Sequence, residues 1–233
     1  MTGADAPRGG PPAPGSSVGD KAGPARVADR PGPARRLRRK EELADAAIRT
    51  LKQLGYARTS LRDIAERSDV AVGTLHYYFA DKTELIGFCV RRYKARFVAT
   101  MDATLAAEPG TERLAERFAQ GLAQSIRKEA EAHRLWYDIR AQSMFDPAFR
   151  EVVQEIETAL IALLARFFAR LEGAPAHPGT ALDGYLLMDA AFCYHLQRFL
   201  AGDNTAPGVF ADHALALLRP LLTREAGAEG PRS

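Results

Sequence analysis

The chain has only two cysteines and one tryptophan among its 233 residues, and no apolar run long enough to span a membrane. Cys89 and Cys193 lie far apart, which argues against a disulfide framework and for a reducing cytosol. The most apolar stretch, residues 185–196, is interrupted by Asp189 and His195 and is shorter than the roughly 18 residues of a membrane helix. The N-terminus lacks the apolar core of a secretory signal. We therefore expect a cytoplasmic protein without a membrane anchor.

The sequence also lacks the usual enzyme signatures. It contains no Gly-rich phosphate loop, dinucleotide fingerprint or Gly-x-Ser-x-Gly elbow. None of the five histidines follows a Glu by three residues, and neither cysteine has neighbours at zinc-ligand spacing. Asp189 and His195 are six residues apart on one helix, which aligns them poorly for acid–base catalysis. We expect no metal site, no cofactor and no enzyme activity, with a helical enzyme kept as an alternative.

The net charge is small, at +3, but it is distributed unevenly. Residues 1–34 carry a net charge of +1, residues 35–94 carry +6, and residues 95–233 carry −4. A basic segment joined to an acidic one is typical of a nucleic-acid-binding module attached to a module of another kind.

Proline and glycine are concentrated at the start of the chain. Residues 1–34 hold seven of the 14 prolines and seven of the 19 glycines, with almost no large apolar side chain. Such a segment cannot bury enough surface to offset its loss of entropy on ordering, so we predict a disordered tail there. A second short tail is expected at residues 225–233.

Helical periodicity dominates the rest of the chain and indicates an all-α fold of about nine helices. We expect a first domain over residues 35–80 and a second over residues 81–224. The predicted helices cover approximately residues 36–54, 60–68, 72–79, 81–105, 111–144, 148–171, 180–200 and 207–223. The helix at 111–144 is expected to break near residues 129–133, and residues 173–179 are expected to form a loop.

Residues 59–85 predict a helix-turn-helix, which presents one helix to the major groove of DNA. Ser60 and Asp63 have the spacing of a capping box, and residues 69–71 form the turn. On the following helix Leu75, Tyr78 and Phe79 share one side, as a packed face should. The opposite arc and its surroundings supply the expected DNA contacts, which are Arg38, Arg39, Ser60, Arg62, Val72, Gly73, Thr74, His76, Tyr77 and Lys82.

Different chemistry is expected of these groups. Hydroxyl, imidazole and phenol groups can donate to phosphates, and Gly73 allows close backbone approach. Lys82 begins a helix and forms a phosphate clamp with its backbone N–H groups. Arg62 can read a guanine edge, and Val72 can touch a thymine methyl. The basic run at 35–40, expected just before the first helix, can follow phosphates or enter the minor groove.

Each of these residues also has an ordinary structural interpretation. A charge run before a helix is usually a solvated surface, Tyr77 and Tyr78 could both belong to the core, and Arg62 could pair with Asp63 or Glu66. The combination of the turn and the local charge of +6 favours DNA contact.

The stretch LADAAIRTLKQLGYARTSLRDIAERSDVAVGTLHYYFADKTEL, from Leu43 to Leu85, resembles the tetracycline-repressor (TetR) family of bacterial transcription regulators. The resemblance is carried by short motifs: Gly-Tyr before the second helix, Ile-Ala inside it, Gly-Thr-Leu and Tyr-Phe in the third, and the Lys that follows. It implies a nine-helix fold, with a three-helix DNA-binding domain at residues 35–80 and a ligand-binding and dimerisation domain at residues 81–224. It also implies a dimer that binds a palindromic operator. It further implies a repressor, located at the nucleoid, that a small molecule releases.

Three positions depart from the family pattern. Asp69 stands where the turn often has Gly, Ala71 where a Ser or Thr cap is common, and Val72 where a polar residue is common. The operator sequence therefore does not follow from the resemblance. A non-specific DNA-organising protein without a ligand is the alternative function.

The last two helices resemble the dimer bundle of the family. Residues 185–199 are apolar almost all round, which requires partners on every side. The final helix carries a second apolar stripe of Phe210, Ala214, Leu217, Leu218, Leu221 and Leu222. We expect these helices to form a four-helix interface in a homodimer, with a monomer core as the alternative.

The body also has enough aromatic side chains to line a pocket, although such residues at helical spacing are commonly plain core. Aromatic walls with few polar groups suit a small apolar or aromatic effector. The expected lining residues are Trp136, Tyr137, Arg140, Met144, Phe167, Tyr185, Met188 and His195.

Overall fold

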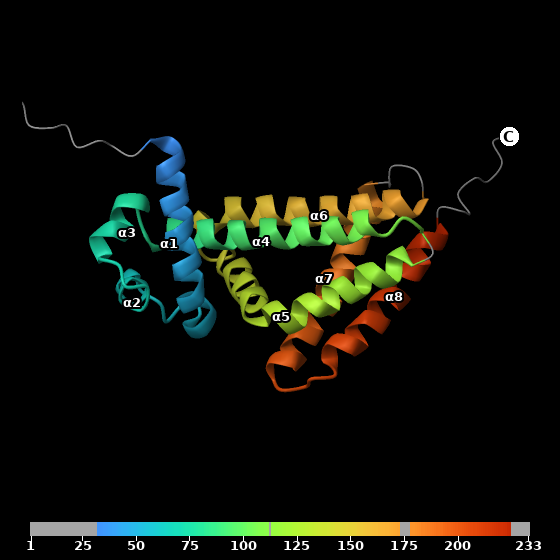
Figure 1. Cartoon of the computed structure of the whole chain (residues 1–233). Helices are drawn as coiled ribbons and strands as arrows, with labels where there is room; N and C mark the ends of the chain where they lie inside the picture. Colours follow the sequence, from blue (N-terminus) through green and yellow to red (C-terminus); the bar gives the residue numbers. More distant parts are fainter. Residues whose placement is uncertain (1–31, 112, 173–177, 225–233) are drawn as a thin grey trace, which may run out of the picture.

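The computed structural model describes residues 32–111, 113–172 and 178–224. These residues form eight α-helices and one 3-10 turn without a strand, which confirms the all-α fold and lies close to the expected nine helices (Figure 1). The predicted tails at 1–31 and 225–233, and most of the predicted loop at 173–179, lie outside the described residues. The elements are α1 Pro33–Leu54, α2 Leu61–Arg67, α3 Val72–Tyr78, α4 Lys82–Ala107, α5 Leu114–Gln142, η1 Pro147–Phe149, α6 Arg150–Glu172, α7 Pro178–Leu200 and α8 Ala206–Arg224.

The start of α1 corrects two expectations. The helix begins at Pro33, three residues earlier than predicted, so residues 33–34 do not belong to a tail. The basic run at 35–40 lies in the first turns of the helix and does not precede it. The reason is local, because proline at the first helical position has a φ angle that suits a helix and lacks only an N–H that would be unpaired there.

Two further boundaries differ because proline starts helices. Pro147 opens a separate 3-10 turn, capped by the Asp146 side chain, and α6 begins only at Arg150. Pro178 opens α7 two residues before the predicted start at Thr180. The break expected near residues 129–133 is confirmed as a kink within α5, where Glu129 has φ −130° and ψ 22°.

The molecule has a small head, formed by α1–α3, and a longer body, formed by α4–α8. In Figure 1, α4 and α6 run side by side along the body, and α5 descends from the head, bends and runs along α8. Helices α7 and α8 pack against each other and against α5. Helix α4 starts at the head and reaches the far end of the body, so it belongs to both regions.

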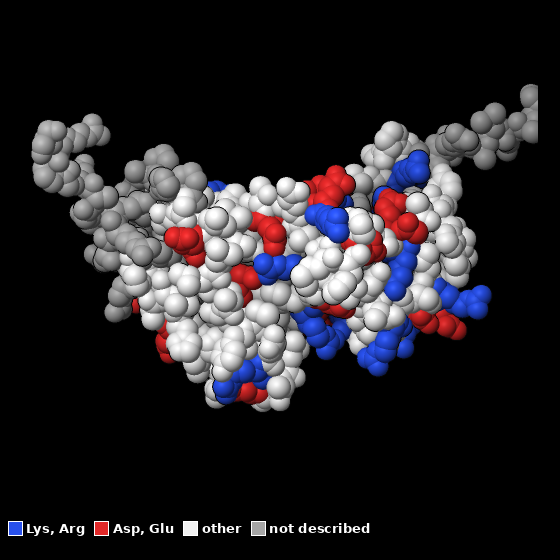
Figure 2. Space-filling view, turned by 180° about the vertical axis from the view of Figure 1, so that it is seen from behind, with Lys and Arg blue, Asp and Glu red and all other residues white. Residues whose placement is uncertain are grey.

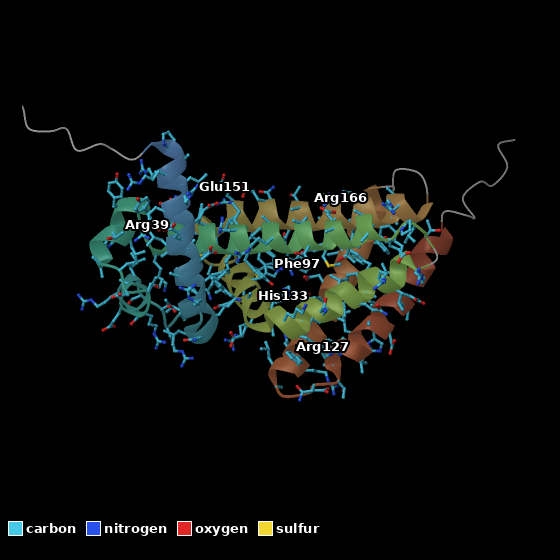
Figure 3. All side chains as sticks on the ribbon, viewed as in Figure 1. Arg39, Phe97, Arg127, His133, Glu151 and Arg166 are labelled. Carbon is cyan, nitrogen blue, oxygen red and sulfur yellow. The ribbon has the colours of Figure 1, made fainter. Side chains whose placement is uncertain are left out.

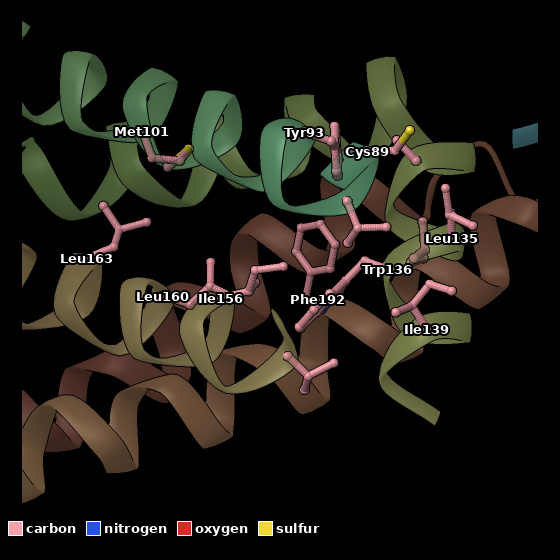
Figure 4. Close-up of a cluster of buried hydrophobic side chains, with 14 of the residues drawn as sticks. Cys89, Tyr93, Met101, Leu135, Trp136, Ile139, Ile156, Leu160, Leu163 and Phe192 are labelled. Carbon is pink, nitrogen blue, oxygen red and sulfur yellow. The ribbon is translucent and has the colours of Figure 1, made fainter. Parts of the chain in front are cut away.

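The core of the body is a continuous cluster of aliphatic and aromatic side chains between α4, α5, α6 and α7 (Figure 4). Trp136, Phe167 and Phe118 are fully buried in it, and the rings of Phe118 and Phe167 stack with centroids 4.4 Å apart. Helix α7 approaches α6 closely at Gly184, where an added Cβ would lie only 2.6 Å from the Phe168 ring. This glycine sets the spacing of two helices that border the cavity described below.

Candidate DNA-binding surface and ligand cavity

Local hydrogen bonds fix the start of α2, the first helix of the helix-turn-helix. The Asp63 carboxylate accepts the Ser60 N–H at 2.7 Å, and the Ser60 hydroxyl accepts the Asp63 N–H at 3.1 Å. This completes the predicted capping box and lowers the pKa of the Asp63 carboxyl through its bonds to Ser60. Asp69 has a φ of 50°, a left-handed conformation that glycine adopts with less strain.

Helix α3 has one buried face and one exposed arc, as predicted. Leu75 and Phe79 are buried in the core, whereas His76, Gly73 and the ring of Tyr77 are exposed. Tyr77 is 54% exposed although it is a large aromatic residue, and no atom lies within 4 Å of where a Cβ would stand at Gly73. The arc therefore offers polar groups and open backbone to a partner outside the chain.

The basic first turns of α1 lie beside this arc. The Arg36 guanidinium is 5.5 Å from the centroid of the Tyr77 ring, so the two helices present their groups on a common surface. Arg38 is exposed, and Arg39, labelled in Figure 3, is exposed and pairs with Glu42 at 2.8 Å. Seen from behind in Figure 2, basic groups gather toward the head end, whereas the broad face of the body carries fewer charges.

Arg62 is exposed on α2 and makes no hydrogen bond or ion pair with any described residue. The alternative that it pairs with Asp63 or Glu66 is wrong for this structure, because the Asp63 carboxylate is occupied by the Ser60 cap. Thr74 and Val72 are half-buried, and Val72 packs against the edge of the core. Arg62 therefore has a free guanidinium, while Val72 offers only part of its side chain.

Lys82 is held inside the chain more tightly than the sequence indicates. Its ammonium donates to the Tyr56 carbonyl oxygen at 2.7 Å and lies 4.2 Å from the centroid of the Tyr56 ring. Burial lowers its pKa. The ammonium has two further N–H donors, so a phosphate contact is compatible with this anchoring role.

A cavity of about 50 Å³ lies in the body between α4, α5, α6 and α7. Figure 3 shows Phe97 and His133, two of its walls, projecting into the space between α4 and α5. The surface is mostly apolar but includes a lysine, a histidine and an aspartate. Its lining residues are Lys94, Phe97, Phe118, Leu122, His133, Tyr137, Leu160, Leu163, Leu164, Tyr185, Met188, Asp189 and Phe192.

Of the eight predicted lining residues, Tyr137, Tyr185 and Met188 line the cavity. Met144 does not, because it lies near the end of α5 and is 70% exposed. His195 is turned away toward α8, where its Nε2 lies 2.9 Å from His213 Nδ1. The remaining three, Trp136, Phe167 and Arg140, lie next to the lining residues Lys94, Phe118 and Asp189 without lining the cavity themselves.

Sequence reasoning missed Lys94 and His133, although a signal for Lys94 was present. Val90, Lys94, Phe97 and Met101 follow one another at spacings of four, three and four residues, so Lys94 falls on the apolar stripe of its helix. A cation at such a position is rarely buried without a reason. His133 falls on the apolar side of α5 in the same way.

Polar groups at one side of the cavity form a network across three helices. Asp189 on α7 accepts a hydrogen bond from the Tyr137 hydroxyl at 2.9 Å and pairs with Arg140. Arg140 also pairs with Glu157 on α6 at 2.8 Å. Burial and the charge of Asp189 raise the pKa of both Tyr137 and Tyr185. Asp189 is therefore already satisfied by a cation and a phenol.

The second half of α5 connects the cavity to the head. His133 and Tyr137 face the cavity, whereas Asp138 accepts the Tyr56 N–H at 3.0 Å on another face of the helix. At the kink, Glu129 pairs with Lys52 of α1 at 2.9 Å. One half-helix thus contacts both the cavity and the base of the head.

Neither membrane nor metal features are found in the described part of the chain. No helix there is long and apolar enough to span a bilayer. No group of three or more His, Cys, Asp or Glu side chains is arranged to hold a metal ion among those residues.

Comparison with known proteins agrees with the geometry of the head. Residues 43–87 match the family described as bacterial regulatory proteins, tetR family. Its DNA-binding head is that of the TetR family. The chain is 25% identical over 159 residues to the transcriptional regulator BetI of Burkholderia lata, covering 65% of this chain and 82% of that one. It is therefore a DNA-binding transcriptional regulator by family.

Two solved structures share the fold of this chain. A transcriptional regulator from Rhodococcus sp. Rha1 superposes with a TM-score of 0.65 at 17% identity, over 79% of this chain and 96% of that one. The multidrug binding protein EbrR, solved with imidazole, superposes with a TM-score of 0.60 at 26% identity, over 77% and 94% of the two chains. Its fold likeness extends over the head and most of the body.

Proposed function

We propose that this TetR-family chain is a repressor that binds a palindromic operator as a homodimer and is released by a small molecule. The observation that carries the DNA contact is the exposed arc of α3 beside the basic first turns of α1. Tyr77, His76 and Gly73 face solvent there, Arg36 lies beside the Tyr77 ring, and Arg38 is exposed in the same turns of α1. Its place of action is the bacterial nucleoid, where operator DNA lies.

The groups of the head divide by the information that they carry. Tyr77, His76 and Lys82 suit phosphate contacts, which position the protein without reading sequence. Arg62 is unpaired and exposed, so its guanidinium is free to bond a guanine edge with two hydrogen bonds. Ser60 has its hydroxyl in the capping box, so its proposed role in DNA binding is to orient α2.

The dimer surface that we propose lies on α7. Leu182, Leu186 and Tyr194 follow at helical spacing and are exposed, with Leu186 at 52% and Tyr194 at 54%. Of the predicted stripe on α8, Phe210, Ala214 and Leu218 are buried within the same chain, Leu217 is half-buried, and the side chains of Leu221 and Leu222 lie outside the described part. We therefore assign the interface to the outer face of α7 and to the exposed residues of α8, such as Val209.

Release follows from the position of α5. An effector in the cavity must displace His133 or Tyr137, and these residues share a half-helix with Glu129 and Asp138, which hold the head. Adjacent major grooves need a head separation of roughly 34–36 Å. An effector that binds more tightly when the heads stand at a different separation weakens operator binding. The loss of operator affinity is limited by the difference between the effector's affinities for the two head arrangements. EbrR has been solved with proflavin and imidazole, which supports a small-molecule effector here.

Selection on random DNA followed by footprinting tests the proposal. We expect an inverted repeat whose half-sites are one helical turn apart, bound by one dimer. Sequence-independent binding, or a monomer by sedimentation at the concentrations that bind DNA, would contradict it. The variant Leu186→Glu tests the interface, with Phe145→Glu, an exposed apolar residue outside α7 and α8, as the matched control.

A further inference from the structure

The cavity is lined by three polar side chains, Lys94, His133 and Tyr185, that make no hydrogen bond with the described residues, and two of them, Lys94 and His133, carry nitrogen donors. Lys94 is only 5% exposed and His133 is fully buried, and both line the cavity. No hydrogen bond or ion pair joins the Lys94 ammonium to the described part of the chain, and neither ring nitrogen of His133 has a partner there. A buried donor without an acceptor is costly, so both groups call for a partner from outside the chain.

The surroundings of the two groups are aromatic. The Lys94 Nζ lies 4.9 Å from the Trp136 ring and 5.1 Å from the Phe97 ring, which gives the ammonium some cation–π stabilisation but no acceptor. The His133 ring contacts Phe97 and Phe192 edge-on, with centroids 5.3 Å and 4.7 Å away. The cavity thus combines an apolar wall with two donors on one side.

The nearby carboxylates do not meet this need. Asp189 lines the cavity but is bonded to Tyr137 and Arg140, and Glu157 is paired with Arg140. These two carboxylates and Arg140 leave a net charge of −1 on the network, which the charged form of Lys94 neutralises only at a distance. A partner that contacts Lys94 directly must therefore bring its own acceptor.

We propose that the effector is a small organic monocarboxylic acid, whose carboxylate accepts from the Lys94 ammonium and the His133 N–H and whose hydrocarbon part lies against Phe97, Phe118 and Leu160. The assignment rests on the proposed function and narrows its effector from apolar or aromatic compounds to their acids. One carboxylate satisfies the ammonium in direct contact and leaves the site with the net charge of −1 that the network already carries. A dianion such as a phosphate monoester would add a further buried negative charge.

The size of the cavity makes the acid small and links its binding to the head. The present volume holds on the order of four water molecules, so an acid of more than a few carbon atoms must push the walls outward. His133 lies four residues after the kink at Glu129, whose carboxylate pairs with Lys52 of the head. Binding at Lys94 and His133 therefore acts on the part of α5 that holds α1.

Proton uptake should accompany binding. Burial lowers the pKa of Lys94 to about 7, and burial together with the Lys94 charge keeps the pKa of His133 well below its usual range. The other titratable or charged groups around Lys94 are Tyr93, Tyr137, Arg140, Glu157, Tyr185 and Asp189. Since only the ammonium form pairs with a carboxylate, affinity for the acid should fall about tenfold per pH unit above that pKa.

The test uses the single tryptophan as a reporter, because Trp136 lies against Lys94. Butyrate, hexanoate and benzoate, and the three corresponding amides, are titrated into the full chain while fluorescence is recorded. We expect at least one acid to bind at least about tenfold more tightly than its amide, with affinity declining between pH 7.5 and pH 9. Equal affinity for acid and amide, or affinity independent of pH, would overturn the assignment.

Two variants locate the acid. Lys94→Met, close to lysine in size, should abolish the preference for acid over amide, and Lys128→Met, an exposed lysine of the same domain, should leave it unchanged. Persistence of acid binding in Lys94→Met would overturn the assignment. If Lys94→Met folds poorly, the pH dependence of acid binding to the unaltered chain still tests the assignment.

Operator binding separates this inference from the proposed function. If neutral compounds but no acids release operator DNA, the assignment of the acid fails and ligand-released repression stands. If acids bind through Lys94 without changing operator affinity, the acid site stands and release by this ligand fails.

Discussion

The head and the body both leave polar groups without partners, but in opposite directions. In the head, Arg62, His76 and Tyr77 point into solvent, where water satisfies them until DNA arrives. In the body, Lys94 and His133 line a mostly apolar cavity, and both side chains are themselves buried. The first arrangement costs the folded chain little, whereas the second destabilises it by several kcal/mol in total. The comparison shows that stability has been given up in the body, where the ligand is proposed to bind.

The largest expected effect comes from removing the buried cation. Lys94→Met should stabilise the chain at pH 7.5 by on the order of 2–5 kcal/mol, because a desolvated ammonium is replaced by an apolar side chain of similar length. The pKa of Lys94 is depressed in the folded state to about 7, so the unfolded chain binds more protons above that pH. Stability of the parent should therefore rise from pH 7 to pH 9 relative to the variant.

Urea denaturation of parent and variant at several pH values measures this difference. A parent that gains no stability relative to Lys94→Met over that range would break the comparison between the two regions, because Lys94 would then carry no burial cost.

A smaller effect is expected from Arg62. Arg62→Ala should cost about 1–3 kcal/mol of discrimination at one base pair of each half-site, because a guanidinium that bonds a base edge is lost. Selection on random DNA with parent and variant measures it. An unchanged motif would show that Arg62 only contacts solvent or phosphate.

Loss of phosphate contacts should weaken binding to all sequences alike. For Tyr77→Ala and Lys82→Ala we expect affinity for operator and unrelated DNA to fall by similar factors, on the order of tenfold, because phosphate contacts carry no sequence information. Gel-shift titrations at two salt concentrations measure this, with Tyr77→Phe as a control for the phenol hydroxyl. Lys82→Ala should also lower the melting temperature, since its ammonium anchors the Tyr56 carbonyl; unchanged DNA affinity would confine it to that anchoring role.

The smallest effect concerns the turn itself. Asp69 has a φ of 50°, so Asp69→Gly should change stability by less than about 1 kcal/mol, with a gain from relieved strain. Asp69→Val, which cannot adopt that conformation easily, is the control and should destabilise the head. A thermal melt of the two variants that gives the opposite order would show that the Asp69 side chain stabilises the turn.

The head was predictable because its signals are local. The capping box of Ser60 and Asp63, the turn at Asp69 and the two faces of α3 each depend on residues within a few positions of one another. The start of α1 at Pro33 was missed, although the signal was also local, because the proline was assigned to the tail. Local propensity therefore accounts for the DNA-facing surface almost completely.

The cavity was only partly predictable because it joins four helices that are distant in sequence. Aromatic content alone pointed to Tyr137, Tyr185 and Met188, but it equally pointed to Met144, which is exposed, and His195, which pairs with His213. Periodicity indicates which face of a helix is buried and does not indicate which faces enclose a cavity.

By itself, the sequence determined the all-α fold, the helix-turn-helix and the face of α3 that is free to meet DNA, because helix periodicity, capping and turn conformation act over a few residues. Only the tertiary structure decided that Lys94 and His133 line one cavity, that α5 connects this cavity to the head, and that Phe210, Ala214 and Leu218 of the predicted α8 stripe are buried inside the chain. The physical reason is that burial and the loss of hydrogen-bond partners depend on how distant helices pack, and no single helix carries that information.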